Sequence, residues 1–354
     1  MSTMTSKTRV LRSLEHKEVD RIPTFYLGGG GVNGKLAQRL GIATTIEEDL
    51  LRALDVDVRF LVPRFIDGTG HCNFQYGGVH AILQKEKGYE SIVMQKLPLE
   101  EMRTVDEILA YERWPNPDWY DYRIPAPYAK RIADRAVVAY DMGIIFLFAM
   151  GLRGMEQIMV DMIESPDIAH AIFGRITDLH CERIRRFVAA NDGFIDIVGI
   201  GDDVAGQSGL FFGIDMWREF LKPYVKKMAD LCHALEVIPY FHGCGGFRDL
   251  YDDFLEMGIR TTGRLQTEAK GNDFAELKRL YGKELSFWGA VDGQHVCIEG
   301  TPDDVRAHVR SLIAANTDNT GFIAGPTHSF TPDTPIENII AVYEALRGKG
   351  KRKQ

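Results

Sequence analysis

The feature of this sequence that most limits its fold is a regular alternation of short apolar runs with longer segments of helical periodicity. Several runs are continuously apolar, which is typical of strands buried on both faces of a parallel sheet. Eight strands that alternate with helices predict an α/β protein, specifically a closed (β/α)8 TIM barrel. A doubly wound open sheet is the alternative that has the same alternation. The eight runs are residues 22–27, 56–62, 137–140, 194–199, 237–241, 260–265, 285–291 and 321–324.

The segments between these runs carry helix signals. In residues 216–235, apolar side chains recur every three or four positions, which predicts an amphipathic helix, and Pro223 predicts a kink or a later start. Thr301 and Thr334 each precede a proline. A threonine cap followed by proline is typical of a helix N-terminus, so we expect the last two helices to begin there.

The chain reads as one domain. Its 354 residues contain no internal repeat and no linker rich in proline, glycine or serine. We therefore expect one barrel domain over residues 21–348, an N-terminal helical extension at 1–20 that packs outside it, and a basic tail at 349–354. Two short strands within 79–83 and 89–95 are expected to form a hairpin over the barrel mouth.

Composition excludes several classes of function. The net charge of −8 and the absence of a basic patch argue against nucleic-acid binding. No run of 18 apolar residues predicts a membrane span, and residues 1–7 lack the apolar core of a signal peptide. Five scattered cysteines do not form a disulfide framework, so we expect a cytoplasmic protein. A barrel of this size is compatible with a monomer or a homodimer.

Polar residues follow nearly every predicted strand. In a (β/α)8 barrel the carboxyl ends of the strands form the functional rim, so these residues are the candidates for the site. We expect Asp202, Asp203 and Tyr26 as catalytic residues, and Gln207, Gln266, Asp292 and Asp57 as substrate-binding residues. The alternative is structural: the aspartate pair would cap a helix in the following segment, residues 206–212, and Gln207, Gln266 and Asp292 would stabilise the rim.

A His and a Cys two residues apart, His242-Gly-Cys244, end the run at 237–241. Zinc binds imidazole nitrogen and thiolate sulfur, and a catalytic zinc uses three protein ligands and one open position. His328, which follows the last run, offers the third ligand. The pair alone is also compatible with a structural turn, and His71-Cys72 is a rival pair on a predicted loop that has no strand-end partner.

At four places the chain resembles the uroporphyrinogen decarboxylase superfamily, which includes zinc-dependent methyltransferases that exchange methyl groups with corrinoid proteins. The segments that carry the resemblance are Asp202-Asp-Val-Ala-Gly-Gln207, His242-Gly-Cys-Gly245, Phe287-Trp-Gly-Ala-Val-Asp292 and His328-Ser-Phe-Thr-Pro-Asp-Thr-Pro335. The resemblance covers nearly the whole chain and implies a (β/α)8 barrel with its site at the carboxyl ends of the strands.

The two branches of this superfamily imply different chemistry. His242 and Cys244 match the His-x-Cys zinc ligands of the methyltransferases, whose third ligand is commonly Cys where this chain has His328. In the metal-free decarboxylases, His328 falls at a substrate-binding His and Asp57 near a pyrrole-binding Asp. Their arginine-rich N-terminal loop is missing here, and without it a porphyrinogen's carboxylates lack their bidentate partners.

The resemblance therefore implies a zinc-dependent methyltransferase or demethylase. Zinc would lower the pKa of a bound thiol or water, or polarise a methyl donor. The chain has no Asp-x-His-x-x-Gly corrinoid signature, so the corrinoid (methylcobalamin) would be carried by a separate partner protein. A small molecule would be the methyl donor or acceptor. The alternatives are a metal-free decarboxylase and a non-enzymatic barrel that binds a ligand or a corrinoid protein.

Overall fold

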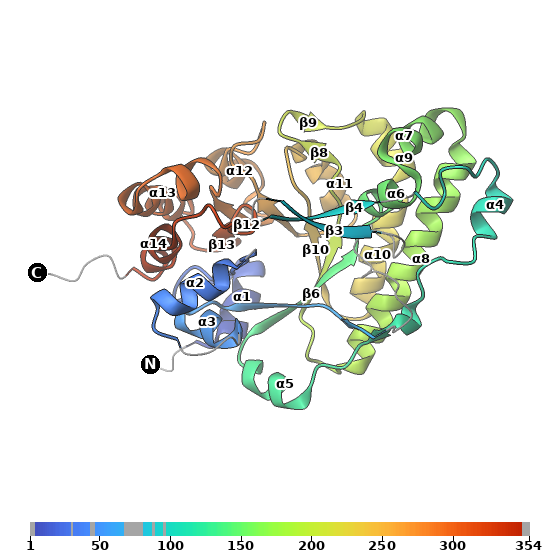
Figure 1. Cartoon of the computed structure of the whole chain (residues 1–354). Coiled ribbons are helices and arrows are strands. Elements are labelled where there is room, and N and C mark those ends of the chain that lie inside the picture. The colour runs from blue at the N-terminus through green and yellow to red at the C-terminus, as the bar shows by residue number, and fades with distance from the viewer. Residues whose placement is uncertain are drawn as a thin grey trace, which may run out of the picture.

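The computed structural model describes residues 4–29, 31–42, 47–66, 81–86, 89–94 and 97–348. A curled parallel sheet lies at its centre (Figure 1). Its strands, in spatial order, are β1 (Val58–Leu61), β6 (Ala136–Gly143), β7 (Ile197–Gly201), β10 (Ile238–His242), β11 (Thr261–Leu265), β12 (Ser286–Val291) and β13 (Phe322–Pro326). These strands confirm seven of the eight predicted runs and the α/β class.

The eighth run, at 22–27, does not form a full strand. Thr24 makes a single parallel bridge to Ala324 of β13, and the N–H groups of Asp57 and Val58 both donate to the Thr24 carbonyl. This extended segment thus lies between β13 and β1. Pro23 has no N–H to donate, which limits its pairing. A closed eight-stranded barrel therefore remains a prediction.

Side chains that alternate along the strands divide the core in two. Val58, Val138 and Tyr240 belong to a small cluster on one face of the sheet, which also contains Trp288. Their chain neighbours, such as Phe241, belong to a much larger cluster under the helices. Successive side chains in a strand point to opposite faces, so continuously apolar strands bury both faces of the sheet.

Helices cover the outer face of the sheet, and the N-terminal helices lie beside the C-terminal ones (Figure 1). The helices are α1 (Ser6–Leu14), α2 (Val32–Arg39), α3 (Glu47–Ala53), α4 (Val105–Leu109), α5 (Ala126–Ile132), α6 (Phe146–Arg153), α7 (Met155–Glu164), α8 (Pro166–Ala190), α9 (Ile214–Phe220), α10 (Lys222–Ala234), α11 (Tyr251–Glu256), α12 (Phe274–Tyr281), α13 (Pro302–Ala315) and α14 (Ile336–Leu346). None of the helices in the described ranges is long and apolar enough to cross a membrane.

Local signals set several helix boundaries. The segment at 216–235 is divided between α9 and α10, and Pro223 lies in the first turn of α10, as a proline near a helix start does. Thr301 caps α13 as predicted and forms a capping box with Asp304. The expected cap at Thr334 is wrong: Pro335 is the N-cap of α14, and the Thr334 hydroxyl instead accepts the N–H of Thr331.

Helix α1, in the predicted N-terminal extension, packs against the small cluster that contains Trp288. Val10 and Leu14 are buried in that cluster together with Val58 and Ile323. Arg9 on the same helix binds Asp57 at the amino end of β1. The N-terminal helix therefore covers the end of the sheet opposite the carboxyl ends of its strands.

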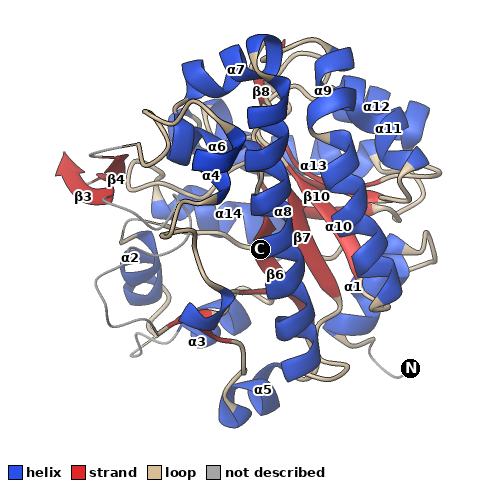
Figure 2. Cartoon of the chain, turned by 90° about the vertical axis from the view of Figure 1, so that its right-hand side faces the viewer, coloured by secondary structure: helices blue, strands red, loops and turns tan. Residues whose placement is uncertain are grey.

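Three short antiparallel pairs complete the fold: β2 (Arg64–Phe65) with β5 (Tyr120–Asp121), β3 (Ala81–Glu86) with β4 (Tyr89–Met94), and β8 (Ala205–Gly206) with β9 (Gly209–Leu210). The second pair confirms that these segments form a hairpin, which projects from the left of the molecule in Figure 2; its place over the barrel mouth stays a prediction. The basic tail at 349–354 and the pair His71-Cys72 lie outside the described residues.

Candidate metal centre

A pocket of about 340 Å³ opens where the parallel strands end. Its wall combines an apolar side with a set of titratable groups, and these come from segments that lie far apart in the sequence. The lining residues are Leu27, Tyr140, Ile144, Leu147, Gly201, Asp202, Asp203, His242, Cys244, Arg264, His328 and Ser329. The carboxyl edge of the sheet therefore holds the candidate site, as the strand-end argument predicts.

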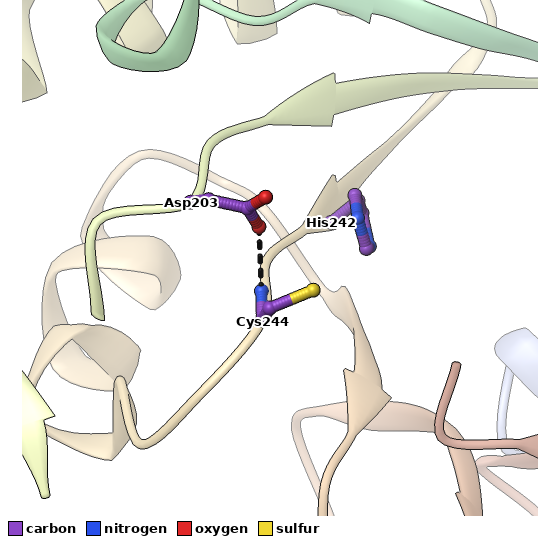
Figure 3. A group of neighbouring side chains, drawn as sticks. All are labelled: Asp203, His242 and Cys244. Atoms are coloured by element: carbon purple, nitrogen blue, oxygen red, sulfur yellow. Dashed lines mark hydrogen bonds between the residues drawn. The ribbon is translucent and has the colours of Figure 1, made fainter. Parts of the chain in front are cut away.

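Three of these side chains form a cluster of potential metal ligands. A carboxylate oxygen of Asp203, a ring nitrogen of His242 and the sulfur of Cys244 lie within 4.8 Å of one another. Figure 3 shows the Cys244 sulfur directed toward the side of His242, with the Asp203 carboxylate above the Cys244 backbone. Carboxylate, imidazole and thiolate are all ligands that zinc accepts.

Backbone contacts between neighbouring strands hold this cluster together. His242 at the end of β10 pairs with Gly201 at the end of β7, and the Asp202 N–H donates to the His242 carbonyl over 2.8 Å. One oxygen of Asp203 accepts the N–H of Cys244 over 2.9 Å. At Gly201, where φ is +133°, a Cβ atom would lie 2.1 Å from the His242 carbonyl oxygen, so only glycine allows this close approach.

The donor groups of the cluster are ones that a divalent cation can bind. Burial, with the Asp203 charge, raises the pKa of Cys244 to about 12. Burial and the nearby Arg264 charge hold the pKa of His242 well below its usual value, so its imidazole is neutral. A neutral imidazole beside two groups that bind metals as anions is a donor set that fits a divalent cation, because the cation stabilises the thiolate that burial disfavours.

His328 lies in the same pocket but is not part of the three-residue cluster. His328 follows β13 and is partly accessible to solvent. Burial of the rest of its ring, together with the Arg264 charge, lowers its pKa. The sequence-based ligand set was His242, Cys244 and His328; in the structure, Asp203 occupies the third place near the first two.

Arg264 and Tyr140 are pocket residues that the sequence argument missed. Arg264 is only 8% exposed, and its Nη2 lies 2.6 Å from the Tyr140 hydroxyl and 2.9 Å from His242 Nε2. Both residues fall inside predicted strands, whereas most of the predicted site residues follow a strand. A charged residue within an apolar strand was the available signal, since a buried arginine requires polar partners.

Asp202 lines the pocket but is not part of the cluster, and its carboxylate binds the start of a helix. Its carboxylate accepts the N–H groups of Ile145, Phe146 and Leu147 at the start of α6. Burial raises its pKa to about 7. The expected helix at 206–212 is wrong, because the strands β8 and β9 lie there, and Asp202 instead binds the start of α6. Asp203 contributes to the candidate metal centre.

The structure does not place Tyr26 or Asp57 in the pocket. The Tyr26 hydroxyl donates to Asn33 over 2.6 Å in the core under the helices, and Leu27, one residue on, lines the pocket instead, because consecutive side chains of an extended segment face opposite ways. Asp57 lies at the amino end of β1, fully buried, where Arg9 and Arg21 bind its two oxygens.

The remaining candidates lie near the rim without lining the pocket. Gln266 is buried and accepts the N–H of Gly245, while exposed Gln207 donates to it over 3.3 Å. Asp292 accepts the N–H groups of Gln294 and His295 in its own turn. These contacts stabilise the loops around the mouth; roles in substrate binding remain predictions.

The fold and the site thus define an α/β protein with a candidate metal centre at the carboxyl edge of a parallel sheet. The chain belongs to the uroporphyrinogen decarboxylase (URO-D) family, whose family model matches residues 130–348. It is 23% identical over 367 residues to the methylcobamide:CoM methyltransferase MtaA of Methanosarcina barkeri, covering 98% of both chains, and 22% identical to the same enzyme of strain Fusaro. A solved methyltransferase structure from Methanosarcina mazei has a TM-score of 0.69 at 18% identity over 98% of this chain and all of that one, a likeness of fold.

Proposed function

We propose that this protein is a zinc-dependent methyltransferase or demethylase that moves a methyl group between a small substrate and a corrinoid carried by a separate protein. The observation that carries the proposal is the cluster of Asp203, His242 and Cys244 inside the strand-end pocket. The two Methanosarcina barkeri relatives, named as methylcobamide:CoM methyltransferases, support it because they align over almost the entire chain.

In this proposal His242, Cys244 and a third residue hold the metal. Asp203 is the third ligand that the distances favour, and His328 is the one that the family resemblance favours. When bound, zinc would activate a thiol or oxygen of the small substrate or polarise its methyl group. This assignment rests on donor chemistry, since carboxylate, imidazole and thiolate are zinc's usual ligands.

The residues around the cluster have separate tasks. Asp203 accepts the Cys244 N–H and so orients the loop that presents the sulfur. Leu27, Ile144 and Leu147 form an apolar wall that excludes water from the reacting groups. Asp202 holds that wall in place through the start of α6.

The pocket mouth is where the corrinoid protein would dock, because a corrinoid must approach the small substrate directly for the methyl group to pass between them.

We also propose that the segment around Thr24 closes the sheet into the (β/α)8 barrel of the family, since it forms hydrogen bonds to both edge strands, β1 and β13. The placement of Asp57 weighs against the metal-free decarboxylase alternative: both its oxygens bind arginines at the opposite edge of the sheet, so it cannot bind a substrate at the mouth.

Metal analysis of the purified protein tests the proposal. We expect about one zinc per chain, as a single site implies. His242→Ala and Cys244→Ala should each lower zinc affinity by more than about 100-fold, since loss of a group that only supports a ligand already costs about 10–100-fold. Cys232→Ala and His233→Ala, adjacent on α10 and outside the pocket, are the matched controls and should bind zinc normally.

The third ligand is decided by a second pair of variants. If Asp203 binds the metal, Asp203→Ala should lose zinc and His328→Ala should keep it. Transfer of methyl from methylcobalamin to small thiols, followed through the corrinoid absorbance, then tests the reaction. Folded protein that binds no zinc yet decarboxylates a carboxylated substrate would refute the proposal. Zinc binding without turnover of any methyl donor or acceptor would favour a binding protein.

A further inference from the structure

Arg264 contacts both ring nitrogens of His242. Its Nη2 lies 2.9 Å from Nε2, and its Nε donates to Nδ1 over 3.4 Å. The guanidinium is also near the Tyr140 hydroxyl, 2.6 Å away, and its central carbon lies 5.8 Å from the centre of the Tyr140 ring. Arg264 ends in the pocket, beside the proposed ligands.

This arrangement conflicts with a metal on His242. A neutral imidazole has one nitrogen with a free lone pair, and a metal ion binds that lone pair. Arginine has only N–H donors, stays charged, and uses the same lone pair as its acceptor. Because an Arg264 nitrogen lies within 3.4 Å of either ring nitrogen, whichever nitrogen binds a metal must first lose its contact with Arg264.

We propose that Arg264 competes with the metal for His242, occupying the ligand nitrogen as a built-in cation and leaving it when the metal binds. Arg264 is thus a positioning residue: it holds the imidazole toward the pocket and lowers metal affinity. The inference rests on the proposed function only in that His242 is a metal ligand.

The surroundings allow Arg264 to leave His242. The pocket of about 340 Å³ lies directly beside the guanidinium, and the Tyr140 hydroxyl offers an acceptor that the side chain can keep after it leaves the ring. Asp203 lies in the same pocket, with one oxygen on the Cys244 N–H. A cation that joins Asp203, His242 and Cys244 therefore displaces the guanidinium into open space rather than into packed core.

Zinc affinity, measured by competition with a chelator on the full chain, tests this inference. We expect Arg264→Gln to raise zinc affinity about tenfold or more, equivalent to about 1.4 kcal/mol. Arg248→Gln is the matched control: it removes the same charge from an arginine that pairs with Glu276 outside the pocket, and its zinc affinity should be unchanged. Arg264→Lys keeps the charge but lacks the planar fork that reaches both nitrogens, and should raise affinity about threefold or more.

Unchanged or weaker zinc binding in Arg264→Gln would overturn the inference. If that variant does not fold in thermal melts, Arg264→Lys decides, and unchanged or weaker binding there would have the same meaning. A crystal structure of the zinc-loaded protein gives an independent answer: separation of Arg264 from both His242 nitrogens supports the inference, and a retained hydrogen bond to the ligand nitrogen refutes it. Wild-type protein that binds no zinc refutes the proposed function itself, which keeps the two failures distinguishable.

Discussion

Asp57→Asn separates a structural aspartate from a substrate-binding one. Arg9 Nη1 lies 2.6 Å from one Asp57 oxygen and Arg21 Nη1 lies 2.6 Å from the other, while the Thr24 N–H donates over 2.8 Å. Breaking a buried ion pair typically costs about 3–5 kcal/mol, because the remaining charge stays buried. Arg9 retains Asp20 as a partner, so we expect the lower part of that range, about 3 kcal/mol.

Chemical denaturation with chelator-treated protein measures this loss, and zinc titration measures the site. Zinc affinity should change by less than about twofold, because Asp57 lies at the opposite edge of the sheet and additive effects are expected for distant positions. Asp20→Asn is the control: its side chain is 42% exposed and Arg9 keeps Asp57 as a partner, so we expect a smaller loss of stability than for Asp57→Asn. A loss under about 1 kcal/mol for Asp57→Asn, or a large fall in zinc affinity, would refute the reasoning.

Three further predictions concern the walls of the site and the core. Gly201→Ala should lower zinc affinity about tenfold or more, measured by chelator competition, because its Cβ would collide with the His242 carbonyl; normal affinity would argue against the close approach. Asp202→Asn should cost about 1–3 kcal/mol in denaturation, since it weakens the acceptor of three N–H groups at the start of α6; an unchanged free energy of unfolding would contradict the capping role. Burial holds the pKa of His180 at about 3, below its unfolded value near 6.5, so its contribution to the free energy of unfolding is present above pH 6.5 and is lost as the pH falls. Wild type should therefore lose about 2 kcal/mol of stability between pH 7 and 5 that His180→Gln does not lose. Parallel plots of stability against pH for the two proteins would refute this.

Much of the fold was predictable because strand and helix patterns are local. Seven apolar runs became the parallel sheet, and the helix starts at Pro223 and Thr301 follow from backbone rules that act within one turn. The run at 22–27 formed only bridges, because the partners of an edge segment are set by the whole sheet.

Side-chain direction within extended segments was less accessible. Of the neighbours Tyr26 and Leu27, one faces the core under the helices and the other faces the pocket. A shift of one residue would reverse the two, and nothing in the sequence near Tyr26 indicates which of them faces the pocket. Asp57 was predicted at the rim as part of the run 56–62, but β1 begins only at Val58, so Asp57 precedes the strand and lies at the opposite edge of the sheet.

The sequence by itself determined the α/β alternation and placed His242 and Cys244 together, because two residues separated by one glycine remain close in any fold. Only the tertiary structure decided which third group approaches them. Asp203 and His328 both follow strands, but distances across the rim depend on strand order and register: β7 lies next to β10, whereas β13 lies three strands away. Strand β11 is the other neighbour of β10, and this pairing places Arg264 beside His242. The spacing of the two residues along the chain does not reveal this contact.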